Sequence, residues 1–227
     1  SVLNLVPLRH GESFKDAMDA MVRLAKRVED LGYTRYWIAE HHNMRSIASS
    51  ATQLLIQHTL ANTKKIRVGS GGVMLPNHSP YLIAEQYGTL ETLYPNRVDL
   101  GLGRAPGTDV PTAMALRRTK DLKTDFERDL AELSGYFKGS NYVQAYPAHG
   151  LYLPFYILGS STDSAYLAAK LGLPYSFAAH FAPTMMENAI AIYNRYFQPS
   201  AILDKPYVIL GVNAILADTD EEAKRLS

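Results

Sequence analysis

The stretch Tyr36-Trp-Ile-Ala-Glu-His-His42 places a short apolar run directly before a carboxylate and two histidines. Buried parallel strands are apolar along their length, and functional side chains often follow their carboxyl ends. Histidine titrates near neutral pH, so it is suited to proton transfer. The stretch alone leaves two interpretations open, a hydrogen-bonded structural cluster and a catalytic site.

Working outward from this stretch, strand-like and helix-like segments alternate along the chain. Seven strands are predicted, at residues 2–5, 36–39, 66–73, 97–103, 155–158, 175–179 and 207–216. Helical patterns follow them, at residues 13–32, 47–63, from 79, 125–137, 162–171, 183–197 and from 218. The first helix opens on Ser13-Phe-Lys-Asp16, a capping box with Asp in place of Glu.

Alternating strands and helices predict a parallel sheet with helices outside it. An open doubly wound sheet and a (β/α)8 barrel are both compatible with this order. Chemistry-bearing residues follow at least four different strands, which favours a barrel mouth over a single crevice. We therefore predict a (β/α)8 TIM barrel, forming one domain over residues 1–227. A barrel needs an eighth strand, so we expect this one to lack its last βα portion at the C-terminus.

Composition narrows the classes of partner. The chain has 227 residues, a net charge of +1, 47% hydrophobic residues and no cysteine. The charge balance gives no reason to expect nucleic acid or an anionic membrane as partner. Without cysteine, disulfides and thiolate metal sites are excluded. The first residues show no secretory signal, and we expect a cytoplasmic location.

The third strand ends in Gly69-Ser-Gly-Gly-Val-Met-Leu-Pro76. Glycine inside a strand usually marks a bulge or a close approach of the backbone to another group. Two interpretations therefore stay open, a bulge that curves the barrel and a flat ring lying on these glycines.

The fourth strand ends in Leu100-Gly-Leu-Gly-Arg-Ala-Pro-Gly107. The glycine spacing does not match a dinucleotide fingerprint, and Pro106 stands where the helix of that motif would begin. Arg104 remains as a partner for phosphate or carboxylate, because its guanidinium donates two parallel hydrogen bonds. The structural alternative is an ion pair between Arg104 and Glu40.

The fifth strand leads into Leu158-Gly-Ser-Ser-Thr-Asp-Ser164. Small hydroxyl residues at a helix N-terminus suit phosphate binding, although ordinary capping by Ser161 or Thr162 explains them equally well. A metal at Glu40, His41 and His42 is disfavoured, because adjacent histidines rarely reach one ion and no third ligand has recognisable spacing. An anion cradle, a glycine-lined surface and a histidine together suit a phosphorylated planar cofactor such as FMN.

At these residues the chain resembles the bacterial luciferase-like flavin-dependent monooxygenases. The resemblance is carried, in order, by Trp37-Ile-Ala-Glu-His-His42, Val68-Gly-Ser-Gly-Gly-Val-Met-Leu-Pro76, Arg97-Val-Asp-Leu-Gly-Leu-Gly-Arg104, Pro154 to Ser164 and Gly172-Leu-Pro174. The phrases GGVMLPNHSP and LGLGRAPGTD are similar to an uncharacterised group of such oxidoreductases. Each motif by itself is weak evidence for this family, but the occurrence of all of them in the same order along the chain is specific for it.

The resemblance implies a (β/α)8 barrel that binds FMN, often as a dimer. It implies His41 as base or hydrogen-bond donor beside the flavin, with Glu40 and His42 as supporting residues and a cis peptide at Gly71-Gly72. The flavin phosphate would be held by Arg104, Ser160, Ser161 and Ser164. The chain departs from luciferase at Gly103, where luciferase has a reactive cysteine, and at Ser160, where it has an acidic residue. A second phosphate-binding arginine has no clear counterpart among Arg117, Arg118 and Arg128.

These features predict an FMN-dependent monooxygenase that uses reduced FMN from a separate NAD(P)H:flavin reductase, with O2, on a small organic substrate. No segment resembles an NAD(P)H fingerprint, which is why a partner reductase is expected. The alternatives are an F420-dependent oxidoreductase, a flavin-binding protein without turnover, and a non-flavin barrel enzyme that binds a sugar phosphate. The connection over residues 105–123 is expected to form part of the substrate wall.

Overall fold

The computed structural model describes residues 1–117, 119–120, 123 and 125–226. The chain separates into two compact units, Ser1–Leu158 (unit 1) and Gly159–Ser227 (unit 2). Among the described residues, no helix combines the length and the apolar composition needed to cross a membrane.

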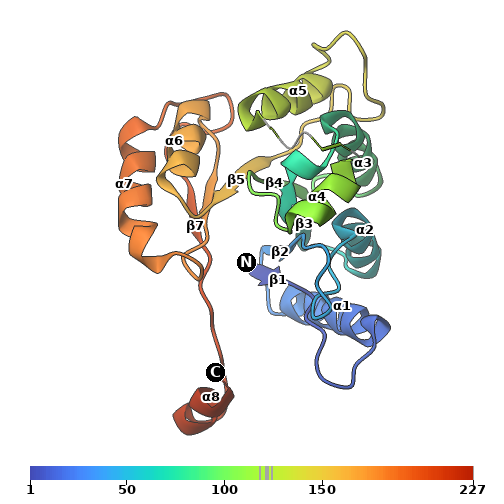
Figure 1. Cartoon of the computed structure of the whole chain (residues 1–227), viewed down its shortest axis with the longest axis vertical. Coiled ribbons are helices and arrows are strands. Elements are labelled where there is room, and N and C mark those ends of the chain that lie inside the picture. The colour runs from blue at the N-terminus through green and yellow to red at the C-terminus, as the bar shows by residue number, and fades with distance from the viewer. Residues whose placement is uncertain (118, 121–122, 124, 227) are drawn as a thin grey trace. The chain divides into compact units, whose positions relative to one another are not determined.

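Unit 1 alternates strands and helices along the chain (Figure 1). Its strands are β1 (Val2–Asn4), β2 (Arg35–Ile38), β3 (Arg67–Met74), β4 (Val98–Gly103) and β5 (Phe155–Gly159), the last residue of β5 belonging to unit 2. Its helices are α1 (Phe14–Asp30), α2 (Thr52–Asn62), the short 3-10 helix η1 (Leu75–Asn77), α3 (Pro80–Leu93), α4 (Val110–Arg117) and α5 (Phe126–Lys138). Neighbouring strands pair in chain order from β1 to β5, and each pair is parallel.

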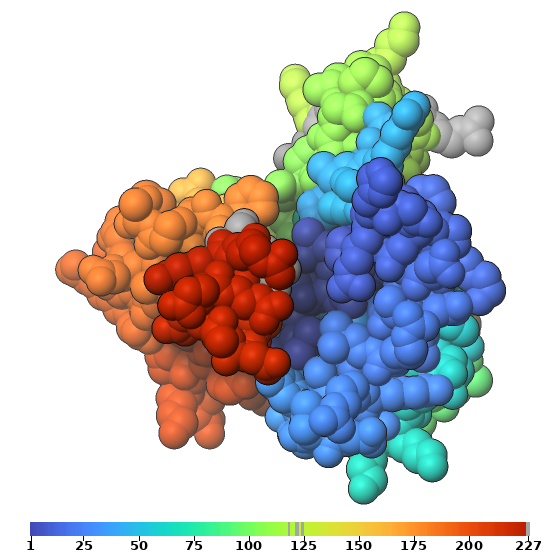
Figure 2. Space-filling model, turned by 90° about the horizontal axis from the view of Figure 1, so that it is seen from below, coloured from blue at the N-terminus to red at the C-terminus, as the bar shows by residue number. Residues whose placement is uncertain are grey.

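Unit 2 pairs β6 (Tyr175–Phe177) with β7 (Val208–Leu210), again in parallel. Its helices are α6 (Thr162–Leu171), the 3-10 helix η2 (Pro183–Met185), α7 (Met186–Tyr196) and α8 (Asp220–Leu226). Residues 211–219 contain no helix or strand and lead to α8, which is red in Figures 1 and 2.

The predicted alternation of strands and helices and the parallel pairing are confirmed, and among the described residues seven strands lie within or close to the predicted ranges. The last strand is shorter than predicted, since it spans Val208–Leu210 and not residues 207–216. The predicted capping box also forms. The Ser13 hydroxyl accepts the Asp16 N–H at 3.2 Å, and the Asp16 carboxylate accepts the Ser13 N–H at 2.9 Å. These contacts satisfy two backbone donors that a helix N-terminus leaves unpaired.

Two helix predictions are wrong. Helix α2 begins at Thr52 rather than at residue 47, because the chain before it pairs with the segment after β1. Ala48 N–H donates to the Val6 carbonyl at 2.9 Å, which holds that part of the backbone out of a helix. Helix α4 lies inside the connection expected to be a loop, where Asp109 accepts the backbone N–H of Thr112 at 2.9 Å. Asp109 is a standard helix-capping residue, so the sequence does contain a local signal for this helix.

Alternate residues of the strands in unit 1 face two different environments. Tyr36, Ile38 and Leu100 are fully buried apolar or aromatic side chains. The Tyr36 hydroxyl donates to the Met21 carbonyl at 3.1 Å, so it attaches α1 to β2. The intervening residue Trp37 points to the other face, together with a set of polar side chains.

That polar set surrounds Asp99, which is fully buried in β4. Its carboxylate accepts from Arg35 Nε at 3.1 Å, from Arg67 Nε at 2.8 Å and from Trp37 Nε1 at 3.1 Å. Arg35 also donates to the Tyr156 hydroxyl at 3.0 Å. These residues come from β2, β3, β4 and β5, so the hydrogen-bonded cluster around Asp99 links four neighbouring strands.

Candidate functional site

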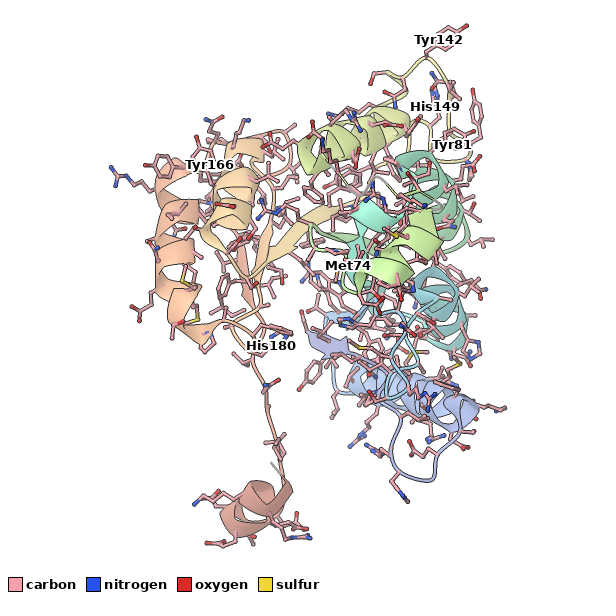
Figure 3. The ribbon with its side chains drawn as sticks, viewed as in Figure 1. Met74, Tyr81, Tyr142, His149, Tyr166 and His180 are labelled. Atoms are coloured by element: carbon pink, nitrogen blue, oxygen red, sulfur yellow. The ribbon has the colours of Figure 1, made fainter. Side chains whose placement is uncertain are left out.

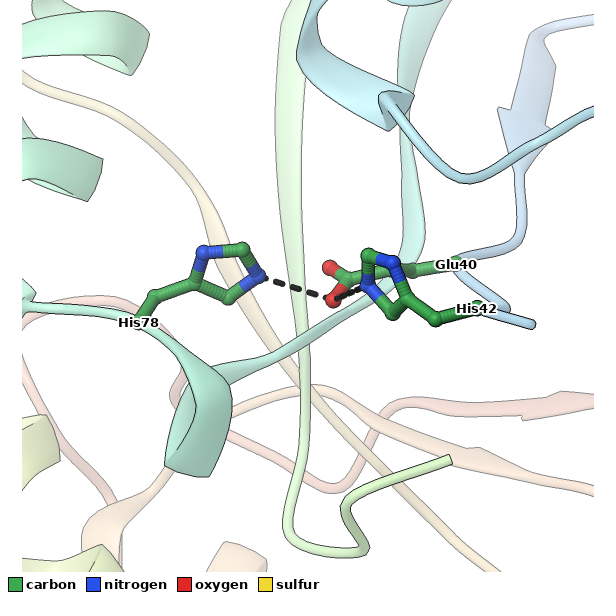
Figure 4. Close-up of side chains that lie close together, drawn as sticks. All are labelled: Glu40, His42 and His78. Atoms are coloured by element: carbon green, nitrogen blue, oxygen red, sulfur yellow. Dashed lines mark hydrogen bonds and ion pairs between the residues drawn. The ribbon is translucent and has the colours of Figure 1, made fainter. Parts of the chain in front are cut away.

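Residues that follow β2 and β3 bring Glu40, His42 and His78 together (Figure 4). Nε2 of His42 lies 2.9 Å and Nε2 of His78 lies 2.8 Å from the same oxygen, Oε1 of Glu40. Backbone N–H of Met74, the last residue of β3 (labelled in Figure 3), donates to Oε2 of Glu40 at 3.1 Å. The chain after β2 and the chain at the end of β3 therefore meet at one fully buried carboxylate.

Burial by itself would raise the pKa of the Glu40 carboxyl. Hydrogen bonds from His42 and His78 oppose this effect, together with the charge of His78 and the backbone N–H of Met74, and the pKa falls to about 2. The carboxylate is thus ionised at neutral pH, and it can accept hydrogen bonds from both imidazoles at once.

His41 has different surroundings from its neighbours. Its Nδ1 lies 3.4 Å from the Gly107 carbonyl, and its backbone N–H donates to the Ser49 carbonyl at 3.4 Å. The ring is half-buried. His41 and the Glu40 cluster thus take separate partners, as expected when successive side chains leave a strand end in different directions. The catalytic role of His41 stays a prediction.

The glycines of β3 lie where strands approach closely. The Gly71-Gly72 peptide is cis, as the family resemblance predicts. A Cβ at Gly71 would lie 2.6 Å from Leu3 Cδ1, and one at Gly72 would lie 2.9 Å from the Gly101 carbonyl oxygen. The register of β3 on β4 shifts between Ser70 and Val73, as the bulge interpretation requires. Packing alone therefore accounts for both glycines, and contact with a cofactor stays a prediction.

Arg104 follows the last residue of β4 and is exposed. The loop that it opens is attached to the chain after β2 and β3 at several points. Asn77 Nδ2 donates to the Pro106 carbonyl at 2.6 Å, and Asn43 Nδ2 donates to Asp109 Oδ2 at 2.9 Å. The Thr108 hydroxyl donates to the His42 carbonyl at 3.3 Å. The carboxyl ends of β2, β3 and β4 thus form one connected surface in unit 1.

The candidates for a second phosphate-binding arginine are not brought to this surface by any described contact. Arg117 donates to the Lys123 carbonyl at 3.0 Å, and Arg128 lies 3.6 Å from the Asp129 carboxylate. Arg118 lies outside the described residues.

The predicted phosphate serines begin α6 in unit 2. Ser161 is the N-cap, and its side chain accepts the Ser164 N–H at 3.5 Å, so the capping interpretation is confirmed. Ser164 is buried, and its hydroxyl donates to the Ser161 carbonyl at 2.7 Å and lies 3.0 Å from the Tyr175 hydroxyl. Ser160 is exposed beside them. A phosphate role for Ser160, Ser161 and Ser164 stays a prediction.

Comparison with known proteins identifies the family. The sequence model described as luciferase-like monooxygenase matches residues 4–227. The chain belongs to the luciferase-like monooxygenase family. It is 56% identical to the uncharacterized protein YddN of Bacillus subtilis (strain 168), with all of this chain aligned to 68% of that protein. It is 52% identical to a luciferase-like monooxygenase of Escherichia coli (strain K12), over 100% of this chain and 69% of that one.

Solved structures agree with the family's fold. Apo-MsnO8 superposes with a TM-score of 0.94 at 37% identity, covering 99% of this chain and 68% of that one. A type II Baeyer-Villiger monooxygenase in complex with FMN superposes at 0.77, with 19% identity over 99% of this chain and 69% of that one. At that identity the likeness concerns the fold alone. The chain therefore has the luciferase-like TIM-barrel fold, and the barrel is incomplete over the residues present.

His78 is the residue of this luciferase-like site that sequence reasoning missed. It stands 36 positions after His42 in Asn77-His-Ser-Pro80, just beyond the third strand. Its place after a strand was a usable signal, because the carboxyl ends of parallel strands lie at one edge of the sheet. No local spacing linked it to Glu40.

Proposed function

We propose that this chain is an FMN-dependent monooxygenase that acts on a small organic substrate. Reduced FMN would supply two electrons, while O2 would give one oxygen atom to the substrate and the other to water. The observation that carries the proposal is the connected surface of unit 1. There His41, the glycines of β3 and Arg104 lie at the ends of three successive strands, where barrels of this fold class hold their active sites.

The residues of this surface fit a phosphorylated flavin by their chemistry. Arg104 is an exposed guanidinium that can pair with a phosphate through two hydrogen bonds. An imidazole that donates Nδ1–H to the Gly107 carbonyl presents Nε2 as a proton acceptor, which suits His41 for holding or moving a proton. Met74 and Leu75 add apolar side chains at the same strand end, which would help to exclude water. Within unit 2, Ser160, Ser161 and the N-terminus of α6 offer hydroxyl and backbone N–H donors of the kind that bind phosphate, and we propose a phosphate role for them.

Equilibrium titration tests the cofactor assignment. FMN and F420, each oxidised and reduced, would be titrated into the purified chain while fluorescence and absorbance are followed. We expect tighter binding of reduced FMN than of F420, and we expect Arg104→Ala to weaken FMN binding by about 10- to 100-fold through the loss of charge-assisted hydrogen bonds. Preference for F420 would instead favour a hydride-transfer enzyme. One solved structure with a similar fold is an F420-dependent secondary alcohol dehydrogenase, with 18% identity over 82% of this chain.

The His41 role needs a separate measurement. His41→Ala should leave FMN affinity within a few-fold of the parent while slowing substrate oxygenation by about 100-fold or more, the range typical of general acid–base groups. His58→Ala, which removes an exposed histidine of α2, is the matched control and should change neither value. Unchanged turnover in His41→Ala would contradict the role. Tight FMN binding without any oxygen consumption would favour a flavin-binding protein without turnover.

A relative suggests the first substrates to test. The N-acetyl-S-alkylcysteine monooxygenase of Bacillus subtilis is 39% identical over 78% of this chain and 56% of its own length. We therefore propose small thioethers of this kind as an initial panel. We also propose a separate NAD(P)H:flavin reductase as electron donor, a homodimer and a cytoplasmic location. Light scattering coupled to size-exclusion chromatography tests the dimer.

A further inference from the structure

We propose that Glu40, His42 and His78 form a binding site for a divalent transition-metal cation, with Zn²⁺ as the first candidate. This inference does not rest on the proposed flavin chemistry. It rests on the type of the three side chains, the convergence of their ligand atoms, and the way in which the carboxylate is held.

The donor set is one that transition metals use. Two imidazole nitrogens and one carboxylate oxygen are the protein ligands of many catalytic zinc sites, with a fourth position left for water or substrate. The same set with more open positions binds Fe²⁺ in oxygenases. Hard cations such as Mg²⁺ prefer oxygen ligands, so two histidines argue against them.

The ligand atoms converge on a small volume. Oε1 of Glu40 lies 2.9 Å from Nε2 of His42 and 2.8 Å from Nε2 of His78, and one ligand atom from each residue lies within 4.8 Å of the other two. Zinc–nitrogen and zinc–oxygen distances of about 2.0–2.2 Å place neighbouring ligands of a tetrahedral site about 3.3 Å apart. Shifts of about 1 Å or less in the two rings would therefore admit a cation. Each ring would bind it through a deprotonated Nε2 and keep its one proton on Nδ1, so that a neutral ring changes tautomer and a protonated ring releases one proton.

The surroundings of Glu40 also suit a ligand. Metal-binding carboxylates are usually held by a hydrogen bond from a neighbouring group, which fixes their orientation. Here Met74 N–H donates to Oε2 at 3.1 Å and leaves Oε1 facing both histidines. The side chain of Glu40 is 1% exposed, whereas those of His42 and His78 are 13% and 22% exposed. The cluster can thus be reached from solvent through the histidines, which is where a fourth ligand would enter.

The spacing of these three residues along the sequence does not indicate that they form one set of ligands. His41 and His42 are adjacent, and no third ligand stands close to them in the sequence, which is why a metal was disfavoured there. In the folded chain only His42 of that pair faces Glu40, and His78 supplies the third group from the segment after β3.

The competing explanation is a purely structural cluster, because the two histidines already satisfy the carboxylate by hydrogen bonding. Substitution by glutamine separates the two explanations. In His42→Gln and His78→Gln the side-chain amide can still donate to Glu40, but it is a poor ligand for Zn²⁺. If the cluster is only structural, the stability of the parent and of these variants will not depend on Zn²⁺.

The test is calorimetric titration of the tag-free, chelator-treated chain with ZnCl₂ and with CoCl₂. We expect one saturable site per chain, a rise in melting temperature with Zn²⁺ and visible ligand-field bands with Co²⁺. Each glutamine variant should bind Zn²⁺ at least about 100-fold more weakly than the parent. The loss of a residue that only holds a metal ligand in place already weakens metal binding by up to about 100-fold. His58→Ala, at an exposed histidine, should bind as the parent does.

Two outcomes would overturn the inference. The first is the absence of saturable binding in the parent chain, with melting temperatures that do not respond to Zn²⁺. The second is binding of equal affinity in the parent and in both glutamine variants, which would place the ion elsewhere. Melting of each variant without metal shows that it is folded, so either outcome can be interpreted directly.

Discussion

At the scale of single side chains, Asp99 links neighbouring strands of unit 1 through a buried cluster of hydrogen bonds. It is fully buried, and it accepts hydrogen bonds from Arg35, Arg67 and Trp37. Removal of one partner from a buried ionic cluster leaves the other charges uncompensated, at about 3–5 kcal/mol. We therefore expect Asp99→Asn to lower the free energy of unfolding by about that amount in urea denaturation.

A matched control for Asp99 lies on α1, where Lys15 pairs with Asp19 at 2.6 Å on an exposed surface. Solvent and salt screen such pairs, so Asp19→Asn should hardly change the urea midpoint. Equal effects of Asp99→Asn and Asp19→Asn would contradict the importance given to the buried cluster.

At the scale of elements, the close packing of β3 on β4 depends on glycine. A Cβ at Gly101 would collide with the Ser70 carbonyl oxygen and lie 2.9 Å from Leu158 Cδ1. Because a backbone atom cannot move aside cheaply, we expect Gly101→Ala to destabilise the chain by about 1–3 kcal/mol. Thermal unfolding followed by circular dichroism measures the change.

Two residues further along the same strand, Gly103 provides the comparison. Its added Cβ would meet Met74 Sδ at 2.9 Å, the end of a flexible side chain that can rotate. Gly103→Ala should therefore be tolerated better than Gly101→Ala. A larger loss for Gly103→Ala would show that the strand contact is not what limits substitution.

Helix α1 is joined to the start of β3 through Glu29, which gives a pH-dependent contribution to stability. Its carboxylate accepts the backbone N–H groups of Lys64, Lys65 and Ile66 at 2.9, 2.6 and 2.8 Å. Burial raises the pKa of Glu29, but these three hydrogen bonds outweigh burial, and the pKa is lowered. A lowered pKa adds stability that is present above the unfolded-state pKa and is lost as pH falls through the folded-state pKa.

Glu29→Gln should consequently be less stable than the parent near pH 7, by about 1–2 kcal/mol for a loss of charge-assisted hydrogen bonds. The difference should shrink as pH is lowered below about 4, the ordinary range of a glutamate. Urea denaturation at several pH values measures it. A difference that stays constant with pH would rule out the carboxylate charge as its origin.

The elements that the sequence predicted best are those with local signals. The capping box at Ser13 predicted the start of α1, and apolar runs predicted where the strands lie, although the last strand ends at Leu210 and not at residue 216. The start of α2 was missed because Ala48 pairs with Val6, a contact between segments that no local pattern records. The Asp99 cluster was missed for the same reason, since Arg35 and Arg67 are ordinary surface residues when each strand is considered alone.

At the scale of the whole molecule, the sequence predicted the location of the candidate site better than it predicted the contacts within that site. The alternation of strands and helices is enough to predict that His41 and Arg104 follow strands that end at one edge of the sheet. Which side chains contact one another at that edge depends on the direction in which each side chain points after its strand ends. Glu40 therefore binds His78, which lies 38 positions away, and Ser164 turns toward Tyr175.

At the same scale, the burial of apolar side chains predicts which part of the chain undergoes local unfolding most easily. The strands of unit 1 have completely buried residues such as Ile38, Val68 and Leu102, whereas Val212 and Leu216 are 71% and 90% exposed. Amides exchange with solvent through local opening, which is least costly where few apolar contacts must break. In hydrogen exchange followed by mass spectrometry, residues 211–219 should exchange earliest and peptides from β3 and β4 last. Helix α6, with Ala165 and Ala168 buried, is the internal control for unit 2 and should exchange slowly. Protection of residues 211–219 equal to that of β3 would contradict this order of stability.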